Sequence, residues 1–338
     1  MLKNWFTIAA TVLACGVLSV QDACGKTPEN FAQLRAAAEN GDVKAQHDLG
    51  QFYDAAGDEK QAIYWWRKAA ERGYAEAQSI LGVSYYYGDG VPKDIVQAAF
   101  WFRKAAEQKN VGGMIRLGDC LAQGHGVTKD EKQAAEWMRK AAERGQPEAQ
   151  FKLGWFYHNG MGVPRDFEKA AEWIRKAAEQ GYAPAQNSLG LIYHQGQGVK
   201  NDDRQAVFWW RKAAEQGNAS AQYNLGLCHA NGFVVEKDLK SAAEYFRKAA
   251  EQGHVGAQIS LAECYANGMG VPKDEKQAAV WIRKAAEQGV KEAQCVLGEC
   301  YLEGLGVPKD EKQAICWLRK AAEQGYEPAK EALKKLGY

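Results

Sequence analysis

Residues 149–184 read AQFKLGWFYHNGMGVPRDFEKAAEWIRKAAEQGYAP, and variations on this string fill most of the 338-residue chain. A Leu-Gly pair, replaced once by Leu-Ala, begins the recognisable part of each copy. The pairs are spaced by 32 residues once and by 36 residues thereafter. A period of this length is typical of a solenoid, in which each unit buries its apolar face against the next. The leucines are Leu49, Leu81, Leu117, Leu153, Leu189, Leu225, Leu261 and Leu297.

Each copy predicts two helices joined by a loop. In the first helix Ala149, Leu153 and Tyr157 recur at helical spacing and therefore share one face. The loop at 160–164, Gly-Met-Gly-Val-Pro, ends this helix, because glycine allows a positive φ and proline does not continue a helix.

The second helix has a predicted start and core, and its end is expected at Gly181. Asp166 is its expected N-cap, and Gln three residues after the equivalent aspartate, as at Gln133, would complete a capping box. Small alanines let two helices approach closely, and a large aromatic side chain such as Trp173 is expected to fill the space between neighbouring copies. The equivalent N-caps are Asp94, Asp130, Asp202, Asp238, Asp274 and Asp310.

The chain is expected to divide into four parts. Residues 1–23 have the basic start, apolar middle and small-residue exit of a signal peptide, with a signal anchor as the alternative. Cys15 lies in a string that resembles a lipoprotein box and could carry a lipid. Residues 24–44 are a predicted N-terminal half-repeat cap, 45–328 eight repeats, and 329–338 a C-terminal capping helix.

Charge excludes two classes of partner. The chain has 43 Lys and Arg against 42 Asp and Glu, and no block of like charge. Nucleic-acid binding needs a basic stripe, so no nucleic acid is expected. The same balance gives no electrostatic reason for binding a membrane surface, so contact with a membrane is expected only through the signal or a lipid anchor.

The repeat, read as Ala-x-x-x-Leu-Gly-x-x-Tyr-x-x-Gly-x-Gly-Val-x-x-Asp and then Ala-x-x-Trp-x-Arg-Lys-Ala-Ala-Glu-x-Gly, resembles the Sel-one-like repeat family. These are relatives of tetratricopeptide repeats, and the resemblance covers Ala45 to Ala329. It implies an all-α fold, a right-handed α-solenoid of about eight helix-turn-helix repeats, that works as a protein-binding scaffold. Bacterial members are often exported. One cysteine-rich branch is associated with penicillin binding, but this chain lacks that branch's one close cysteine pair per repeat.

Cysteine and histidine do not predict a metal site here. Four cysteines occupy one repeat position, where other copies carry apolar residues, so they are interpreted as small buried hydrophobes. Cys295 and Cys316 are the most plausible disulfide pair. His158 and His194 are repeat equivalents whose spacing argues against a shared metal ion, and no Cys-x-x-Cys occurs. The four equivalent cysteines are Cys120, Cys228, Cys264 and Cys300.

Catalytic motifs are absent from the sequence. No serine has lysine three positions later, and neither Lys-Thr-Gly nor Gly-x-Ser-x-Gly occurs. The repeated Arg-Lys pair, as at Arg175 and Lys176, is explained by Arg bonding to carbonyls or carboxylates and Lys facing water. We therefore predict no enzyme, no catalytic residue, no cofactor and no metal.

A binding groove is expected on the variable positions of the first helices, because a solenoid's function lies there. An exposed apolar stripe marks a binding surface, and Glu263 and Glu299 would favour a basic flank at the far end. The alternative is that curvature packs these residues against the adjacent first helices. The predicted partner-binding residues are Phe151, Trp155, His158, Leu191, His194, Tyr223 and Leu227.

These observations predict an exported protein–protein interaction scaffold, periplasmic or secreted, that binds a protein or peptide in its groove. Two alternatives remain open: a β-lactamase-like or penicillin-binding envelope hydrolase, and a glycan-binding envelope adaptor.

Overall fold

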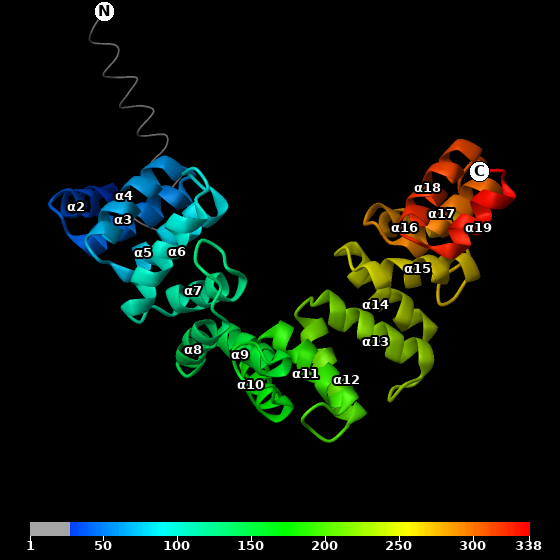
Figure 1. Cartoon of the computed structure of the whole chain (residues 1–338), viewed down its shortest axis with the longest axis horizontal. Coiled ribbons are helices and arrows are strands. Elements are labelled where there is room, and N and C mark those ends of the chain that lie inside the picture. The colour runs from blue at the N-terminus through cyan, green and yellow to red at the C-terminus, as the bar shows by residue number, and fades with distance from the viewer. Residues whose placement is uncertain (1–27) are drawn as a thin grey trace, which may run out of the picture. The chain divides into compact units, whose positions relative to one another are not determined.

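The computed structural model describes residues 28–338, which form eighteen helices and no strand. The all-α prediction is therefore confirmed for this part of the chain. The helices belong to two compact units, one ending at Trp173 and the other running from Ile174 to Tyr338, with the boundary inside α10. From α2 to α9 and again from α11 to α19, each helix packs on the next one along the chain (Figure 1).

Eight helix pairs make up the repeats, as the period predicts. The first helices of repeats one to eight are α3 (Val43–Ala55), α5 (Ala75–Tyr87), α7 (Val111–Gln123), α9 (Pro147–Asn159), α11 (Ala183–Gln195), α13 (Ala219–Asn231), α15 (Val255–Asn267) and α17 (Lys291–Glu303). The second helices are α4 (Glu59–Glu71), α6 (Ile95–Glu107), α8 (Glu131–Ala142), α10 (Phe167–Glu179), α12 (Asp203–Glu215), α14 (Leu239–Glu251), α16 (Glu275–Glu287) and α18 (Glu311–Glu323).

One further helix lies at each end of the array. Helix α2 (Pro28–Glu39) packs on α3, where Phe31 and Leu34 contact the buried cluster around Leu49. Helix α19 (Glu327–Lys335) packs on α18 and buries Leu333. These contacts cover apolar side chains that a repeat with only one neighbour would leave exposed.

The loop inside each repeat is held by local bonds. In repeat three Gly124 ends α7 in the left-handed conformation, with φ of 75°. The Asp130 carboxylate accepts a bond from the backbone N–H of Gln133, 2.9 Å away, which confirms the predicted N-cap. The predicted capping box is wrong, because it requires the Gln133 side chain to accept a bond from the Asp130 backbone N–H. The Gln133 side chain donates to the Asp130 carboxylate instead. The Asp130 backbone N–H instead donates to the carbonyl of Leu121.

The second helix uses two adjacent positions: that of Trp173, expected to fill the space between neighbouring copies, and the next one, which packs on the first helix of the same repeat. Trp65 and Trp209 are buried, but Trp101 and Trp137 are only half-buried, at the edge of the core. The next residue along the second helix, such as Phe102, lies over the glycine of Leu-Gly. The side chains that lie over this glycine in the described units are Trp66, Phe102, Met138, Trp210, Phe246 and Leu318.

A buried glutamine connects successive repeats. The Gln222 side chain in α13 donates to the carbonyl of Ala214 in α12, at 3.3 Å. Its own oxygen accepts a bond of 2.8 Å from Gln252, which follows α14. The sequence signal for this chain of glutamine bonds is the Ala-Gln pair that recurs in the first helices. Equivalent glutamine pairs are Gln78 with Gln108, Gln186 with Gln216, Gln258 with Gln288, and Gln294 with Gln324.

Within residues 28–338, no helix is both long enough and apolar enough to cross a membrane. The predicted signal peptide at 1–23 and the lipidation position Cys15 lie outside the described residues.

Candidate partner-binding face

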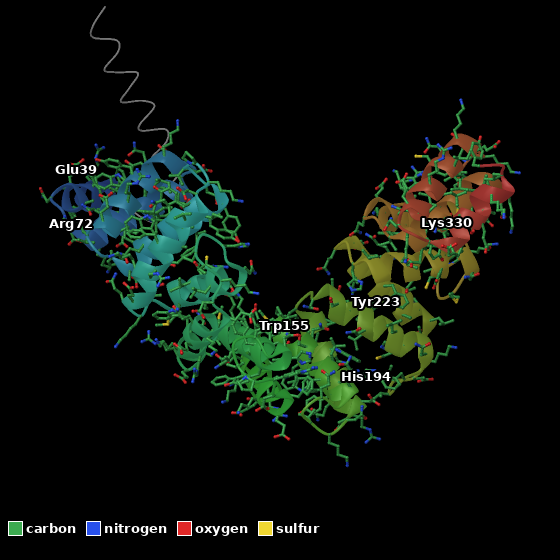
Figure 2. The ribbon with its side chains drawn as sticks, viewed as in Figure 1. Glu39, Arg72, Trp155, His194, Tyr223 and Lys330 are labelled. Atoms are coloured by element: carbon green, nitrogen blue, oxygen red, sulfur yellow. The ribbon has the colours of Figure 1, made fainter. Side chains whose placement is uncertain are left out.

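The predicted groove residues lie on three first helices. Phe151, Trp155 and His158 are on α9 in the first unit. In the second unit, Leu191 and His194 are on α11, and Tyr223 and Leu227 are on α13. In each unit, we call the positions of these residues and of their repeat equivalents the first-helix stripe of that unit. Figure 2 marks Trp155 in the first unit, and His194 and Tyr223 in the second.

Trp155 is the most exposed apolar side chain of the predicted set, with 51% of its surface accessible. Its ring lies 6.5 Å from that of His158, which in turn makes an edge contact with Phe167 at 5.1 Å. Phe151 is half-buried. The part of the stripe on α9 therefore presents an indole to solvent.

Tyr223, unlike Trp155, packs against other side chains of its own unit. Its ring lies 4.6 Å from that of His254 and 5.8 Å from that of Phe246. Gly256 makes room for it, since a Cβ there would stand 3.0 Å from the ring. Leu227 and Tyr223 pack against the same core cluster, which contains Phe246. For these two residues the structure agrees with the alternative of packing on the adjacent repeat.

His194 is engaged by its own repeat and by the next one. Its Nδ1 lies 2.8 Å from an oxygen of Asp203, and its ring makes an edge contact with Phe233 at 5.5 Å. Leu191 packs at the border of the same core cluster as Phe233. No group of three or more His, Cys, Asp or Glu suited to a metal ion occurs in residues 28–338.

A hollow that the sequence interpretation missed lies in the first unit, between α5 and α7. Its volume is about 250 Å³. The floor includes Phe102 and Cys120, which are 1% and 2% exposed, and the wall includes Val83, Tyr86 and Tyr87. The Tyr86 hydroxyl lies 3.0 Å from Nδ1 of His125.

Charged side chains border this hollow. The Lys152 ammonium donates to Asp119 at 2.6 Å and lies 2.9 Å from a carboxylate oxygen of Glu148. Burial lowers the pKa of Lys152, but its bonds to the two carboxylates outweigh burial and raise the pKa overall. Arg116 lies on the same rim. A sequence signal existed, since Arg116 and Lys152 occupy one repeat position that is uncharged in the other full-length repeats.

The six cysteines in the described part of the chain are all free. Cys120, Cys228, Cys264 and Cys295 are buried, which confirms the small-hydrophobe interpretation for these four, while Cys300 is half-buried. Burial raises the pKa of Cys120, Cys228 and Cys295 to about 11, so they remain thiols at neutral pH. The disulfide expected between Cys295 and Cys316 is not formed, and Cys316 is exposed.

The Arg-Lys pairs have other partners than expected. Arg247 donates to the hydroxyl of Tyr265 at 3.0 Å, and the same bond joins Arg283 to Tyr301. The Lys284 ammonium lies 3.9 Å from the centre of the Trp281 ring, in cation–π contact. The arginine is bound by the tyrosine of the next repeat and the lysine by the tryptophan of its own helix, so neither charge indicates a ligand.

An all-α array of helix pairs with a variable exposed stripe and no metal cluster among the described residues is the architecture of a repeat scaffold. The Sel1 repeat model matches residues 43–74, 75–110, 111–146, 147–182, 183–218, 219–254, 255–290 and 291–326. The chain therefore belongs to the Sel1 repeat family. Proteins of this family are generally protein–protein interaction scaffolds and typically not enzymes.

Three solved structures illustrate what this chain is similar to. A Sel1 repeat protein from Oxalobacter formigenes is 38% identical, with 92% of each chain covered and a TM-score of 0.72. A protective antigen present in uropathogenic Escherichia coli strains, which displays an SLR fold, is 31% identical over 90% of this chain and 91% of its own, with a TM-score of 0.44. Cysteine rich protein B from Helicobacter pylori is 28% identical over 38% of this chain and 92% of its own, with a TM-score of 0.32.

Proposed function

We propose that this chain is an exported, non-enzymatic scaffold that binds a partner protein or peptide through its first-helix stripe. The observation that carries the proposal is the exposure of Trp155. A tryptophan with 51% of its surface accessible lies on α9 directly after Leu153 and Gly154, which are buried. Water does not favour an exposed indole, and tryptophan is among the residues that most often dominate the energy of a protein interface.

The repeat equivalents of Trp155 support the same surface. Val83 and Asp119 occupy its position in the first unit, and Leu191, Leu227, Glu263 and Glu299 occupy it in the second. The two residues before it are Leu-Gly in nearly every repeat because they are packed inside. A constant scaffold with a variable surface position is the arrangement through which solenoids select partners.

Trp155 provides the direct test. A photo-crosslinking amino acid placed at position 155 in living cells captures the partner, which is identified and purified. The full-length Trp155→Ala variant should then bind that partner at least about tenfold more weakly, because an interface tryptophan contributes on the order of 2 kcal/mol.

Phe100→Ala is the matched control. Phe100 is 47% exposed, but it lies on α6, a second helix. Both variants should keep the wild-type circular dichroism spectrum. Equal partner affinity of the Trp155→Ala variant and the wild type would exclude the stripe on α9 as the binding surface.

Separate experiments test the two other parts of the proposal, export and the absence of catalysis. N-terminal sequencing of protein recovered from cells should show loss of the leader, and labelled palmitate should report any lipid, with Cys15→Ser as control. Turnover of a chromogenic β-lactam by the pure protein would contradict the non-enzymatic part of the proposal.

A further inference from the structure

We propose that the hollow between α5 and α7 selects partner segments in which an apolar side chain is followed by an acidic side chain. The apolar side chain enters the hollow, and the Arg116 guanidinium binds the carboxylate. This inference rests on the proposed function, that first helices bind a partner protein, and it names the chemistry of that partner.

The interior of the hollow suits one apolar side chain. Phe102 and Cys120 close its floor and are almost fully buried, so the floor belongs to the rigid core. Tyr87 stands at the rim with 60% of its surface exposed and makes an edge contact with the Tyr86 ring at 5.1 Å. The bond between Tyr86 and His125 fixes that wall. A volume of about 250 Å³ holds a side chain and not a whole peptide segment.

The rim of the hollow carries one cation that is ion-paired but makes no hydrogen bond within its own unit. Lys152 is held by Asp119 and Glu148, so its charge is already compensated. The Arg116 guanidinium reaches Asp119 only at 3.9 Å, beyond hydrogen-bond distance, and its side chain is 43% exposed. No hydrogen bond joins that guanidinium to any residue from 28 to 338. Arginine has five donors that match a carboxylate in a two-point contact, so a partner's acidic group fits the exposed side of this guanidinium.

Among the full-length repeats, only repeats three and four carry a basic residue at the position of Arg116 and Lys152. The position of Arg116 and Lys152 is occupied by uncharged residues in the other full-length repeats: Ile80, Ser188, Asn224, Ser260 and Val296. A basic side chain is therefore not needed to build the repeat. The two basic residues lie on neighbouring first helices, and Lys152 positions the Asp119 carboxylate on the rim beside Arg116.

Peptide binding tests the proposal. The probes are short fluorescent peptides, acetylated and amidated, that differ only in a central Phe-Glu, Phe-Gln, Phe-Lys or Ser-Glu pair. A further probe ends in Phe with a free carboxylate. Fluorescence anisotropy with the full chain should show at least about tenfold tighter binding of Phe-Glu than of Phe-Lys, because a charge-assisted bond is gained. Phe-Glu should also exceed Ser-Glu, and its advantage over Phe-Gln should shrink as salt is added.

Arg116→Glu should reverse the preference, so that Phe-Lys binds better than Phe-Glu. Arg103→Glu is the matched control: it makes the same charge change on exposed α6 surface outside the hollow and should leave the preference as in the wild type. Equal binding of the capped peptides, or a preference for the free carboxylate terminus, would overturn the proposal.

The test of the hollow and the test of the proposed scaffold function can fail independently of each other. If Arg116→Glu changes nothing while Trp155→Ala still loses the partner, the hollow is excluded and the scaffold function stands. If the capped peptides follow the predicted order but Trp155→Ala keeps full partner affinity, the stripe on α9 fails and the hollow remains.

Discussion

The ring of Phe246 in α14 lies directly over Gly226 in α13, so closely that a Cβ on Gly226 would stand 2.5 Å from the nearest ring carbon. Helices α13 and α14 can approach this closely only because the first carries glycine at that place. Repeat seven has alanine instead, at Ala262, and the residue of α16 at the same position is the slimmer Ile282. Glycine and the residue above it therefore form a matched pair in each repeat.

Gly226→Ala should destabilise the protein by about 2 kcal/mol, because an extra methyl in a packed core forces neighbours out of place. Adding Phe246→Ile should restore much of that loss, since the double variant then carries the pair that repeat seven uses. Urea denaturation followed by circular dichroism measures both. If the double variant is less stable than Gly226→Ala alone, the two positions are not matched.

Val234 stands in the left-handed region with φ of 63°, where Gly162 and Gly270 have φ of 66° and 71°. A β-branched residue is strained there. Val234→Gly should therefore stabilise the protein by about 1 kcal/mol after the entropy cost of glycine is subtracted. Thermal unfolding measures the shift. The control is Val235→Gly, at a half-buried neighbour with ordinary φ that packs on the core, and it should lower the midpoint.

Gln222→Ala should destabilise the protein by about 2 kcal/mol, because the Ala214 carbonyl and the Gln252 side chain lose their buried partner. Repeat three shows a compatible replacement: Met114 stands at the glutamine position, and Arg144 bonds to the carbonyl of Lys109.

The double variant Gln222→Met with Gln252→Arg should accordingly recover stability relative to Gln222→Ala. Chemical denaturation of the three proteins tests this chain of glutamine bonds. A loss of under half a kilocalorie for Gln222→Ala would show that the bonds contribute little.

His254 should make α15 sensitive to acid. Its Nδ1 accepts the N-cap bond from the backbone N–H of Ala257 at 3.1 Å, which requires that nitrogen to be unprotonated. Burial lowers the pKa of His254 below the ordinary value of about 6.5, so below that pH the unfolded chain binds more protons than the folded one. Stability from this residue is therefore complete above about pH 6.5 and declines as the pH falls toward the folded pKa.

His254→Asn should weaken this decline, because the amide oxygen of asparagine caps helices in this protein without titrating, as at Asn110 and Asn218. The reciprocal variant Asn218→His should introduce a new acid-sensitive step. Midpoints of urea unfolding at neutral and mildly acidic pH give the comparison, and parallel pH profiles of His254→Asn and the wild type would contradict the assignment.

Much of the fold was predictable because its causes are local. The helix ends at Gly124 and Asp130 depend on φ and on a carboxylate a few residues away, and the 36-residue copies repeat them seven times. The burial of Leu153 follows from helical spacing alone. The chain of glutamine bonds through Gln222 and Gln252 was not predicted, since its two residues are 30 positions apart and each is ordinary by itself.

The candidate site, like the fold, was predictable only where its causes are local in the sequence. Among the seven groove residues inferred from spacing, Trp155 is open to solvent, while Tyr223 is packed on the next repeat. The hollow beside Arg116 was missed because its lining is drawn from four helices, α5, α6, α7 and α9, that lie far apart in the sequence.

By itself, the sequence determined that this protein is an array of paired helices, where the loop inside each full-length repeat lies, and which face of the first helices is buried. Those properties depend on backbone preferences and on periodicity within one repeat. Only the tertiary structure decided which of the remaining apolar side chains stay exposed. That depends on the backbone of the neighbouring repeat, where the glycine at 256 admits the ring of Tyr223 and removes it from the surface available to a partner.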